Sequence, residues 1–577
     1  MSKIFSYIKE NYRETAIVAT ITLFALILRL ILLNNYGDLW LDELYSWYFS
    51  SQNNVFTTVS KLLLQDIHMP LYFVILHFWI KLFGQSDISM HLCTLTLTLP
   101  LIPLSFYLIK KLFNKTSAYF SAIFLALNTW CMYYSLEVRF YGMVFVLSLL
   151  SAFSFAKILE NFEKKYIMTF VISHILLIYT FSAAGLLTIM NALLAVAYLF
   201  VKHRENFAKM LKVFSVLLIL SLPAIVVMIH NTFVFNNGIC SFVKDIYVFS
   251  WQNLVEFFEM FFSNGTMLDS NGIFVPSLPR LLFIVLIVLP ILIGLIGLIK
   301  SIFSKNRVLY FFLIPSLMFL FAVLILALIG KMAFLTRYTT IIFPVVICSA
   351  CYGISLFKWK KIGIFIFTLW IIVNYLYLYI VPINILTMPR NGLGELSKIL
   401  TEQVKIKDSD ILLIPYSGSK VMRYVPKGFY IPFEADDMLL LKNSKSLEFY
   451  FGTQNIDKKK VREYMHNYIA NNIIMPAYYD NLCSYIDKMN KGDRLIIISY
   501  RDGFTMPLIA NWQILQDKYD KINLFALMMS KVTKDSLEIA QKTLKPLGYI
   551  QVQNSGYSIF VYEKQYICDK IKEKFRR

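Results

Sequence analysis

The stretch TAIVATITLFALILRLILL, residues 15–33, decides the fold class of this chain. An α-helix rises about 1.5 Å per residue, so a run of about 19 residues is long enough to cross the hydrocarbon core of a bilayer. No small-residue cleavage site follows the run, which predicts an uncleaved first membrane helix rather than a signal peptide. The composition agrees, because 58% of the 577 residues are hydrophobic and only 16% are charged. A soluble domain carries about 25% charged residues.

The apolar runs predict a polytopic α-helical membrane protein with eleven spans. The predicted spans cover residues 15–34, 88–109, 117–135, 140–158, 167–182, 184–201, 211–230, 281–299, 308–330, 338–356 and 362–382. With the N-terminus in the cytoplasm, nineteen Lys and Arg residues fall on cytoplasmic segments and seven on outward loops. Basic residues concentrate on the cytoplasmic side of membrane proteins, so this orientation is favoured. The net charge of +20 then reflects topology, and we expect no nucleic-acid partner.

An odd number of spans places the C-terminal part of the chain outside. We therefore expect a transmembrane domain over residues 1–383 and an extracytoplasmic domain over residues 384–577. In the second domain three short runs have the composition of strands, and residues 531–544 have that of a helix, which predicts an α/β class. The three runs are DILLIPYS (410–417), DRLIIISY (493–500) and YSIFVYEK (557–564).

One apolar run, residues 70–83, is too short to cross the membrane, and crossing would reverse the charge pattern. We expect it to form a helix at the outer interface, with His68, Trp79 and Lys81 at headgroup depth. The first outward loop is therefore predicted to be long and structured.

The seven cysteines show no metal-ligand spacing. Five lie in or near the apolar region and are interpreted as small buried hydrophobes: Cys93, Cys131, Cys240, Cys348 and Cys351. Cys483 and Cys568 lie in the polar tail and could pair if that tail faces an oxidising compartment.

Acidic residues gather in the first outward loop, in GDLWLDELYSWYF at residues 37–49. Asp42 and Glu43 stand there among aromatic residues, which anchor helices at the boundary of lipid and water. A lipid-carried substrate presents its head group at that boundary, and a carboxylate there could act as a general base. The alternative is an interfacial loop whose acids merely face water.

Three arginines could complete a polar site on the outer side. Glu137 and Arg139 stand in the second outward loop, YYSLEVRFYG at residues 133–142, and an arginine can hold a phosphate through two parallel hydrogen bonds. Arg29 lies near the outer end of the first span, and Arg337 precedes the tenth. The alternatives are a structural pair for Glu137 and Arg139, snorkelling for Arg29 and anchoring of a helix end for Arg337.

At these residues the chain resembles the GT-C membrane glycosyltransferases, in particular the superfamily of protein O-mannosyltransferases and the lipid A aminoarabinose transferase. The matching motifs are Arg29, Trp40-Leu41-Asp42-Glu43, HMPLY at residues 68–72, Glu137-x-Arg139-x-Tyr141 and Arg337-Tyr338. In order, they cover roughly residues 15–345 of the chain. Met69 departs from the family's H-P-P-L pattern, and the tail lacks a β-trefoil repeat, which weakens the case for a protein acceptor.

The resemblance implies an inverting transfer of a sugar from a polyprenyl-phosphate donor. Asp42 would deprotonate the acceptor hydroxyl, and Glu43 would position the acceptor or the sugar. The donor phosphate would be bound by Arg29, Arg139 and Arg337, and the substrates would be contacted by His68, Glu137, Tyr141 and Tyr338. No cofactor is expected, and members of this group are generally thought not to need a catalytic metal. A divalent metal ion remains an alternative, because the chain keeps further acids in these loops: Asp38, Asp66 and Glu137.

We therefore expect a glycosyltransferase of a prokaryotic plasma membrane. Its partners would be the polyprenyl-phosphate sugar, membrane lipid and an envelope acceptor, which could be a glycan, a glycolipid or a protein. One alternative is a transporter or lipid flippase with a non-catalytic ectodomain, which would place ionisable residues near the bilayer midplane. Prolines inside several spans keep that alternative open, and a non-catalytic envelope receptor is another. The sequence does not identify which sugar is transferred.

Overall fold

The computed structural model describes most of the N-terminal two thirds of the chain and isolated segments beyond it. The described residues are 12–34, 38–39, 41–65, 68–236, 251–263, 282, 284–329, 334, 336–380, 393–405, 411–413, 429–430, 494–500, 544–551 and 557–564. The chain divides into two compact units. The membrane unit comprises Met1–Tyr36 and Tyr45–Met388, and the C-terminal unit comprises Gly37–Leu44 and Pro389–Arg577.

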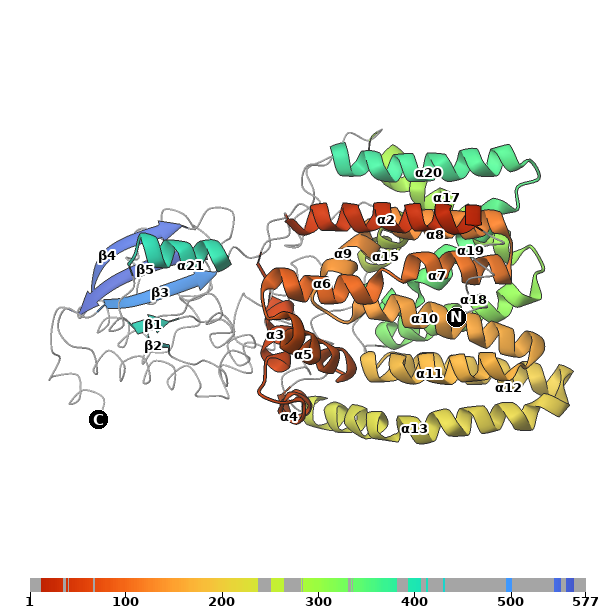
Figure 1. Ribbon diagram of the computed structural model, residues 1–577, viewed down its shortest axis with the longest axis horizontal. Helices are drawn as coiled ribbons and strands as arrows, with labels where there is room; N and C mark the ends of the chain where they lie inside the picture. The colour runs from red at the N-terminus through yellow and green to blue at the C-terminus, as the bar shows by residue number, and fades with distance from the viewer. Residues whose placement is uncertain are drawn as a thin grey trace. The chain divides into compact units, whose positions relative to one another are not determined.

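Long apolar helices form the membrane unit, and most of them run side by side (Figure 1). The helices before the C-terminal unit are α2 (Tyr12–Asn34), α3 (Leu41–Ser50), α4 (Val55–Gln65), α5 (Leu71–Phe83), α6 (Asp87–Thr98), α7 (Leu101–Leu112), α8 (Lys115–Leu127), α9 (Thr129–Leu136), α10 (Tyr141–Asn161), α11 (Lys164–Thr180), α12 (Ala184–Lys202), α13 (Arg204–Asn236), α15 (Trp251–Phe262), the π-helix η1 (Ile284–Val288), α17 (Leu289–Ile302), α18 (Arg307–Leu328), the 3₁₀ helix η2 (Thr336–Ile342), α19 (Phe343–Ser355) and α20 (Lys360–Ile380).

Where the structure describes them, the eleven predicted spans fall on helices. Among the described residues, eight helical segments are long and apolar enough to cross a membrane. The other three predicted spans fall on α8, which has 13 residues, α11, which has 17, and α20, which has 21. A multi-pass helical membrane protein is therefore confirmed, while the count of eleven stays a prediction.

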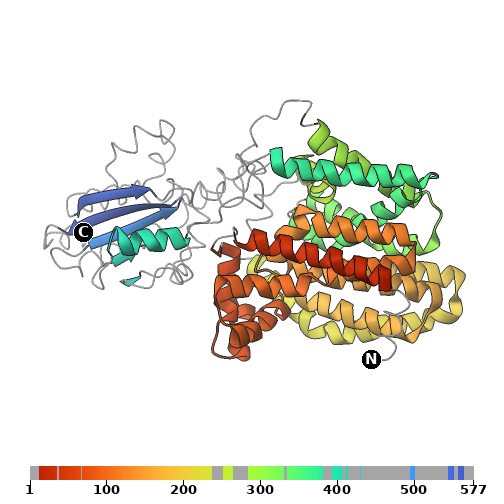
Figure 2. The same ribbon diagram turned by 45° about the horizontal axis from the view of Figure 1, so that its top comes forward.

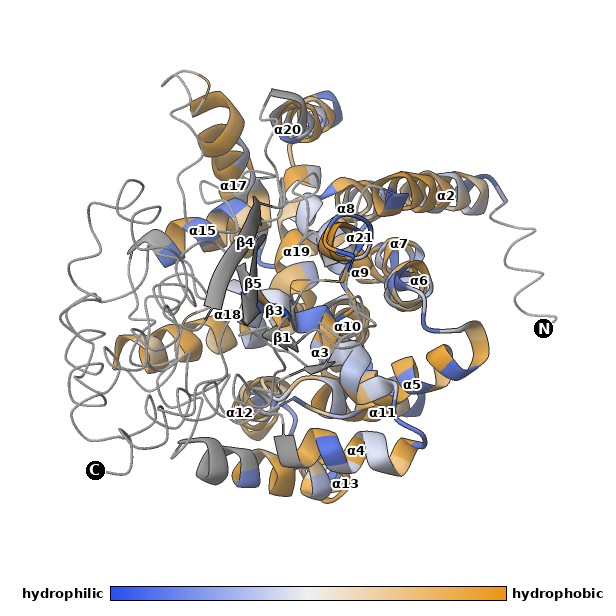
Figure 3. Ribbon diagram, turned by 90° about the vertical axis from the view of Figure 1, so that its left-hand side faces the viewer, coloured by the Kyte–Doolittle hydropathy of each residue, from blue (hydrophilic) through white to orange (hydrophobic). Residues whose placement is uncertain are grey.

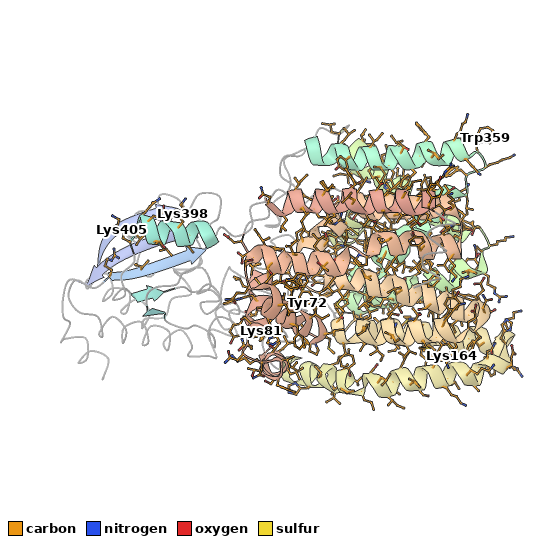
Figure 4. All side chains as sticks on the ribbon, viewed as in Figure 1. Tyr72, Lys81, Lys164, Trp359, Lys398 and Lys405 are labelled. Carbon is orange, nitrogen blue, oxygen red and sulfur yellow. The ribbon has the colours of Figure 1, made fainter. Side chains whose placement is uncertain are left out.

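Residues predicted for the same side of the membrane lie at the same end of the membrane unit. Glu14 pairs with Lys110 and, at 2.8 Å, with Lys115, which ties the start of α2 to the turn between α7 and α8. Figure 4 shows Lys164 and Trp359 at one end of the unit and Tyr72 and Lys81 at the other. The helices thus separate the predicted cytoplasmic and outward segments. The assignment of each end to a compartment stays a prediction.

The first outward loop folds into the short helices α3, α4 and α5. Figures 1 and 2 show them together at one end of the long helices, and Figure 3 shows α4 lying across the direction of those helices. Phe49, Leu62 and Phe73 form a buried cluster between them. The outer surface of α5 exposes Phe78 and Leu82. An exposed apolar surface fits the predicted interfacial position of residues 70–83.

Two glycines bring the backbones of α17 and α19 into contact. A Cβ atom on Gly353 would lie 1.8 Å from the carbonyl oxygen of Gly297, and one on Gly297 would lie 2.5 Å from that of Ala350. Small residues at helix interfaces let membrane helices approach closely and gain packing energy. Since η2 leads directly into α19, this contact also fixes the segment that carries Arg337.

The C-terminal unit contains helix α21 (Leu393–Glu402) and a five-stranded sheet of order β2-β1-β3-β5-β4. Its strands are β1 (Ile411–Leu413), β2 (Phe429–Tyr430), β3 (Arg494–Tyr500), β4 (Leu544–Gln551) and β5 (Tyr557–Lys564). β1 pairs in parallel with β2 and β3, and β5 pairs antiparallel with β3 and β4. Arg494 of β3 donates hydrogen bonds to the carbonyls of Val404 and Lys405 just after α21. The Arg494 side chain thus joins the sheet to the segment that ends α21.

The three runs predicted as strands coincide with β1, β3 and β5. Leu544, predicted as the end of a helix, instead begins β4, and residues 531–543 lie outside the described residues, as do Trp40 and Asp66. Four cysteines are buried and unpaired, as the sequence predicts: Cys93, Cys131, Cys348 and Cys351. Cys240, Cys483 and Cys568 also lie outside the described residues.

The contact between α17 and α19 predicts that Gly353→Ala destabilises the protein. The added methyl group would meet the backbone of Gly297, so the helices would have to separate, which costs on the order of 1–3 kcal/mol in overpacked sites. Thermal unfolding of the purified protein in detergent measures the loss. Gly185→Ala is the matched control, because its methyl group would meet only Met228, at 3.8 Å. Equal melting temperatures for the two variants would contradict the prediction.

Candidate active site

Asp42 and Glu43 stand in the first turn of α3. The N-terminal end of a helix carries a partial positive charge, so carboxylates are stabilised there. Glu43 is fully buried, whereas Asp42 is partly exposed. Both residues belong to the segment Gly37–Leu44, which groups with the C-terminal unit, so their approach to the arginines of the membrane unit stays a prediction.

Within the membrane unit, the second half of α3 leads by aromatic contacts to His68. The Phe49 ring packs on that of Phe73, with centroids 6.2 Å apart, and Phe73 lies 6.3 Å from the His68 ring. The His68 ring also lies 5.5 Å from that of Phe140 in the second outward loop. The first and second outward loops therefore meet at His68.

Arg139 donates a hydrogen bond from Nη2 to Nε2 of His68, over 2.8 Å. A guanidinium has only donors, so Nε2 of His68 is the acceptor of this hydrogen bond. Arg139 is 3% exposed, and its guanidinium carbon lies 5.4 Å from the centre of the Phe140 ring. A charge at this depth is held by hydrogen bonds and ring contacts rather than by water.

The second loop is held rigidly at the ends of α9 and α10. The backbone N–H of Arg139 donates to the carbonyl of Glu137 over 2.6 Å, and His91 of α6 donates from Nδ1 to the carbonyl of Leu136. Gly142 follows, where a Cβ atom would lie 2.0 Å from the Thr98 hydroxyl. Glycine is therefore needed for α10 to approach α6, and the approach fixes where Glu137 and Arg139 stand.

Arg337 approaches the second loop through Tyr134. η2 packs against α10, α15, α18 and α19. Arg337 and Glu137 both act electrostatically on the Tyr134 hydroxyl, and the Tyr134 ring lies 4.6 Å from that of Tyr141. Two segments about 200 residues apart in sequence therefore converge on one tyrosine. Tyr338, next to Arg337 on η2, is partly exposed.

Arg29 is buried, and its donors are engaged elsewhere. Its Nε donates to the Ser135 hydroxyl over 2.9 Å, and Nη1 donates to the Ala126 carbonyl over 2.9 Å. A further contact of Nη2 reaches the Leu125 carbonyl at 3.4 Å. These contacts join α2 to the break between α8 and α9 and give Arg29 a structural role, while its predicted role at the donor phosphate is not tested by them.

Sequence reasoning did not single out Glu256 on α15. The helix lies in the predicted outward loop between α13 and η1, and the partly exposed Glu256 lies beside the hydroxyl of Thr336, the residue before Arg337. Burial raises the pKa of Glu256 to about 7, while the Thr336 hydroxyl opposes the shift. The signal available in the sequence was WQNLVEFFEMFF, residues 251–262, an amphipathic run that carries two of the few acids of the outward loops.

Solved structures with a similar fold include two of ArnT, the aminoarabinose transferase, from Cupriavidus metallidurans. The apo structure matches with a TM-score of 0.51 and 9% identity, over 95% of this chain and 98% of that one. The structure bound to undecaprenyl phosphate matches with a TM-score of 0.52 and 10% identity, over the same shares. No protein-family model and no curated protein sequence matches this chain. The chain therefore has the GT-C fold of membrane glycosyltransferases.

The pairing of Arg139 with His68 predicts different effects for two substitutions at position 68. His68→Gln keeps an oxygen that can accept from Arg139, whereas His68→Phe keeps the ring contacts but removes the acceptor. A buried charge that loses an acceptor costs about 1–3 kcal/mol, so His68→Phe should be the less stable variant in thermal unfolding. Equal stability of the two would show that Arg139 does not depend on this hydrogen bond.

Proposed function

We propose that this protein is a glycosyltransferase that moves a sugar from a polyprenyl-phosphate-linked donor to an acceptor of the cell envelope. The likeness of its fold to that of glycosyltransferases supports the reaction class, and one of those structures holds undecaprenyl phosphate. The observation that carries the proposal is the Arg139–His68 pair, with Arg337 close to the same loop, at one end of the membrane unit.

The donor phosphate binds at these arginines. Guanidinium groups match the geometry of phosphate oxygens and stay charged at all relevant pH values. Arg139 is already oriented by His68 and by the short backbone turn at Glu137, so little ordering is left for the moment of binding. His68, Glu137, Tyr141 and Tyr338 surround the sugar and the acceptor in this proposal.

Asp42 supplies the base of the reaction. It takes the proton of the acceptor hydroxyl, whose oxygen attacks the anomeric carbon from the side opposite the phosphate. The bond between that carbon and the phosphate oxygen breaks, its electron pair leaves with the polyprenyl phosphate, and the configuration inverts. Glu43 positions the acceptor or the sugar. The arginines stabilise the charge that develops on the leaving phosphate, which is the transition-state interaction that accelerates such a step.

The reaction takes place on the outer face of the plasma membrane. The excess of basic residues on the predicted cytoplasmic segments supports an N-terminus inside and a C-terminal domain outside. The first two outward loops, which carry Asp42, Glu43 and Arg139, then face the envelope, where the acceptor is a glycan, a glycolipid or a protein.

Asp42→Asn should abolish transfer of a radiolabelled sugar from a polyprenyl-phosphate donor to envelope acceptors. A general base contributes about 10²–10⁴ to a rate, and an amide cannot take the proton. Asp87→Asn is the control, because Asp87 is also an acid in a first helical turn after the first loop but is not in the proposed site. Full activity of Asp42→Asn would show that Asp42 is not the general base. Movement of lipid or solute across vesicles without consumption of donor would favour the transporter.

Chelation should leave the transfer rate unchanged within about two-fold, because the arginines already balance the charge of the leaving phosphate. The measurement is the same assay with excess EDTA, with and without added Mg²⁺ or Mn²⁺. A loss of activity that the added ion restores would show that a divalent metal takes part.

A further inference from the structure

The turn between α19 and α20 is held in place by close helix packing. A Cβ atom on Gly353 of α19 would lie 1.8 Å from the carbonyl oxygen of Gly297 and 2.8 Å from the backbone nitrogen of Ser301, both on α17. A Cβ atom on Gly363, near the start of α20, would lie 2.8 Å from the carbonyl oxygen of Ile354 on α19. The ends of α17, α19 and α20 therefore meet at this turn.

Four lysines gather where these three helices meet. Lys300, in the last turn of α17, places its ammonium group 4.1 Å from the centre of the Phe357 ring, which begins the turn. The next four residues, KWKK at 358–361, are all exposed, and Trp359 is 68% exposed. Figure 4 shows Trp359 at the same end of the membrane unit as Lys164. One short turn thus presents several cations and a large aromatic ring.

The helices that carry these lysines contain no acid to balance them. The sequence has no Asp or Glu from residue 270 to residue 394, a stretch that includes α17, α18, α19 and α20. Other lysines at this end do have acidic partners: Lys110 and Lys115 pair with Glu14, Lys157 with Glu160 and Lys165 with Glu163. Since neighbouring cations repel one another, an anion from outside the chain would stabilise this turn.

The exposed face of α20 indicates what kind of molecule carries that anion. Ile362, Phe365, Ile372 and Leu376 are exposed and follow one another at intervals of three, seven and four residues, so they share one face of the helix. α20 is predicted to cross the membrane, and this face then contacts lipid chains. Tryptophan is enriched at headgroup level, so Trp359 at the end of the face places the lysines beside lipid phosphates.

We propose that residues 357–361, together with Lys300, form a binding site for the headgroup of an anionic phospholipid, whose acyl chains lie along the exposed face of α20. Lysine binds phosphate as a point charge on a flexible stem, so the site selects net negative charge rather than one headgroup shape. Trp359 and Tyr72 lie at opposite ends of the membrane unit (Figure 4). The site is therefore separate from the proposed sugar transfer.

The test is equilibrium binding of fluorescent phosphatidylglycerol to the purified full-length protein in detergent, with phosphatidylcholine of the same acyl chains as the comparison. Phosphatidylglycerol should bind more tightly, and its advantage should shrink between about 0.1 M and about 1 M salt, because salt screens exposed charges. One lysine near an anionic lipid surface contributes about five-fold to binding, so the triple variant K358Q/K360Q/K361Q should lose on the order of 10- to 100-fold in affinity.

The matched control is the triple variant K202Q/K209Q/K212Q. It removes the same charge from exposed positions predicted for the same side of the membrane, where α13 carries Glu205 in its first turn. It should bind phosphatidylglycerol nearly as the unaltered protein does.

Three results would overturn the inference. An equal loss in both triple variants would mean that the whole end attracts anions without a defined site. Equal affinity for phosphatidylglycerol and phosphatidylcholine would mean that charge is not recognised. Displacement of phosphatidylglycerol by inorganic phosphate at the same concentration would assign the turn to a free anion instead of a lipid.

Discussion

The arrangement of the outer end depends on how the chain satisfies its backbone where α8 stops short. α8 ends at Leu127, and the carbonyls of Leu125 and Ala126 accept from Arg29 in the absence of a continuing helix. Polar backbone groups at bilayer depth must find partners within the protein, and a buried guanidinium must find acceptors. Here the Arg29 guanidinium and the two carbonyls of α8 satisfy each other. Asn128 then begins α9 by accepting from the backbone N–H of Cys131, which directs the chain towards the second outward loop.

The polar groups of the membrane unit follow from that change of direction. α9 carries Tyr134, which lies near Glu137 and Arg337, and the loop after it carries Arg139, which reaches His68. Tertiary contacts rather than sequence neighbours hold these side chains, since α6, α10, α15 and η2 all take part. A site built on such packed elements is ordered before a ligand arrives, and a preorganised site loses less entropy on binding.

The sequence was sufficient for the class of fold but not for the meeting of distant segments. The lengths of the apolar runs identify the helices of the membrane unit, because bilayer thickness sets the length of a span. The asymmetry of basic residues predicts their orientation. Strand-like composition likewise located β1, β3 and β5. Nothing in residue spacing could place His68 against Arg139, 71 residues away, since that depends on how the loops before α5 and α10 meet. Glu256 was missed because an acid in a loop looks like a solvated charge until its helix is seen to pack against η2 and α17. Arg29 was singled out as a charge near the end of a predicted span, and its acceptors could only be known from the break after α8.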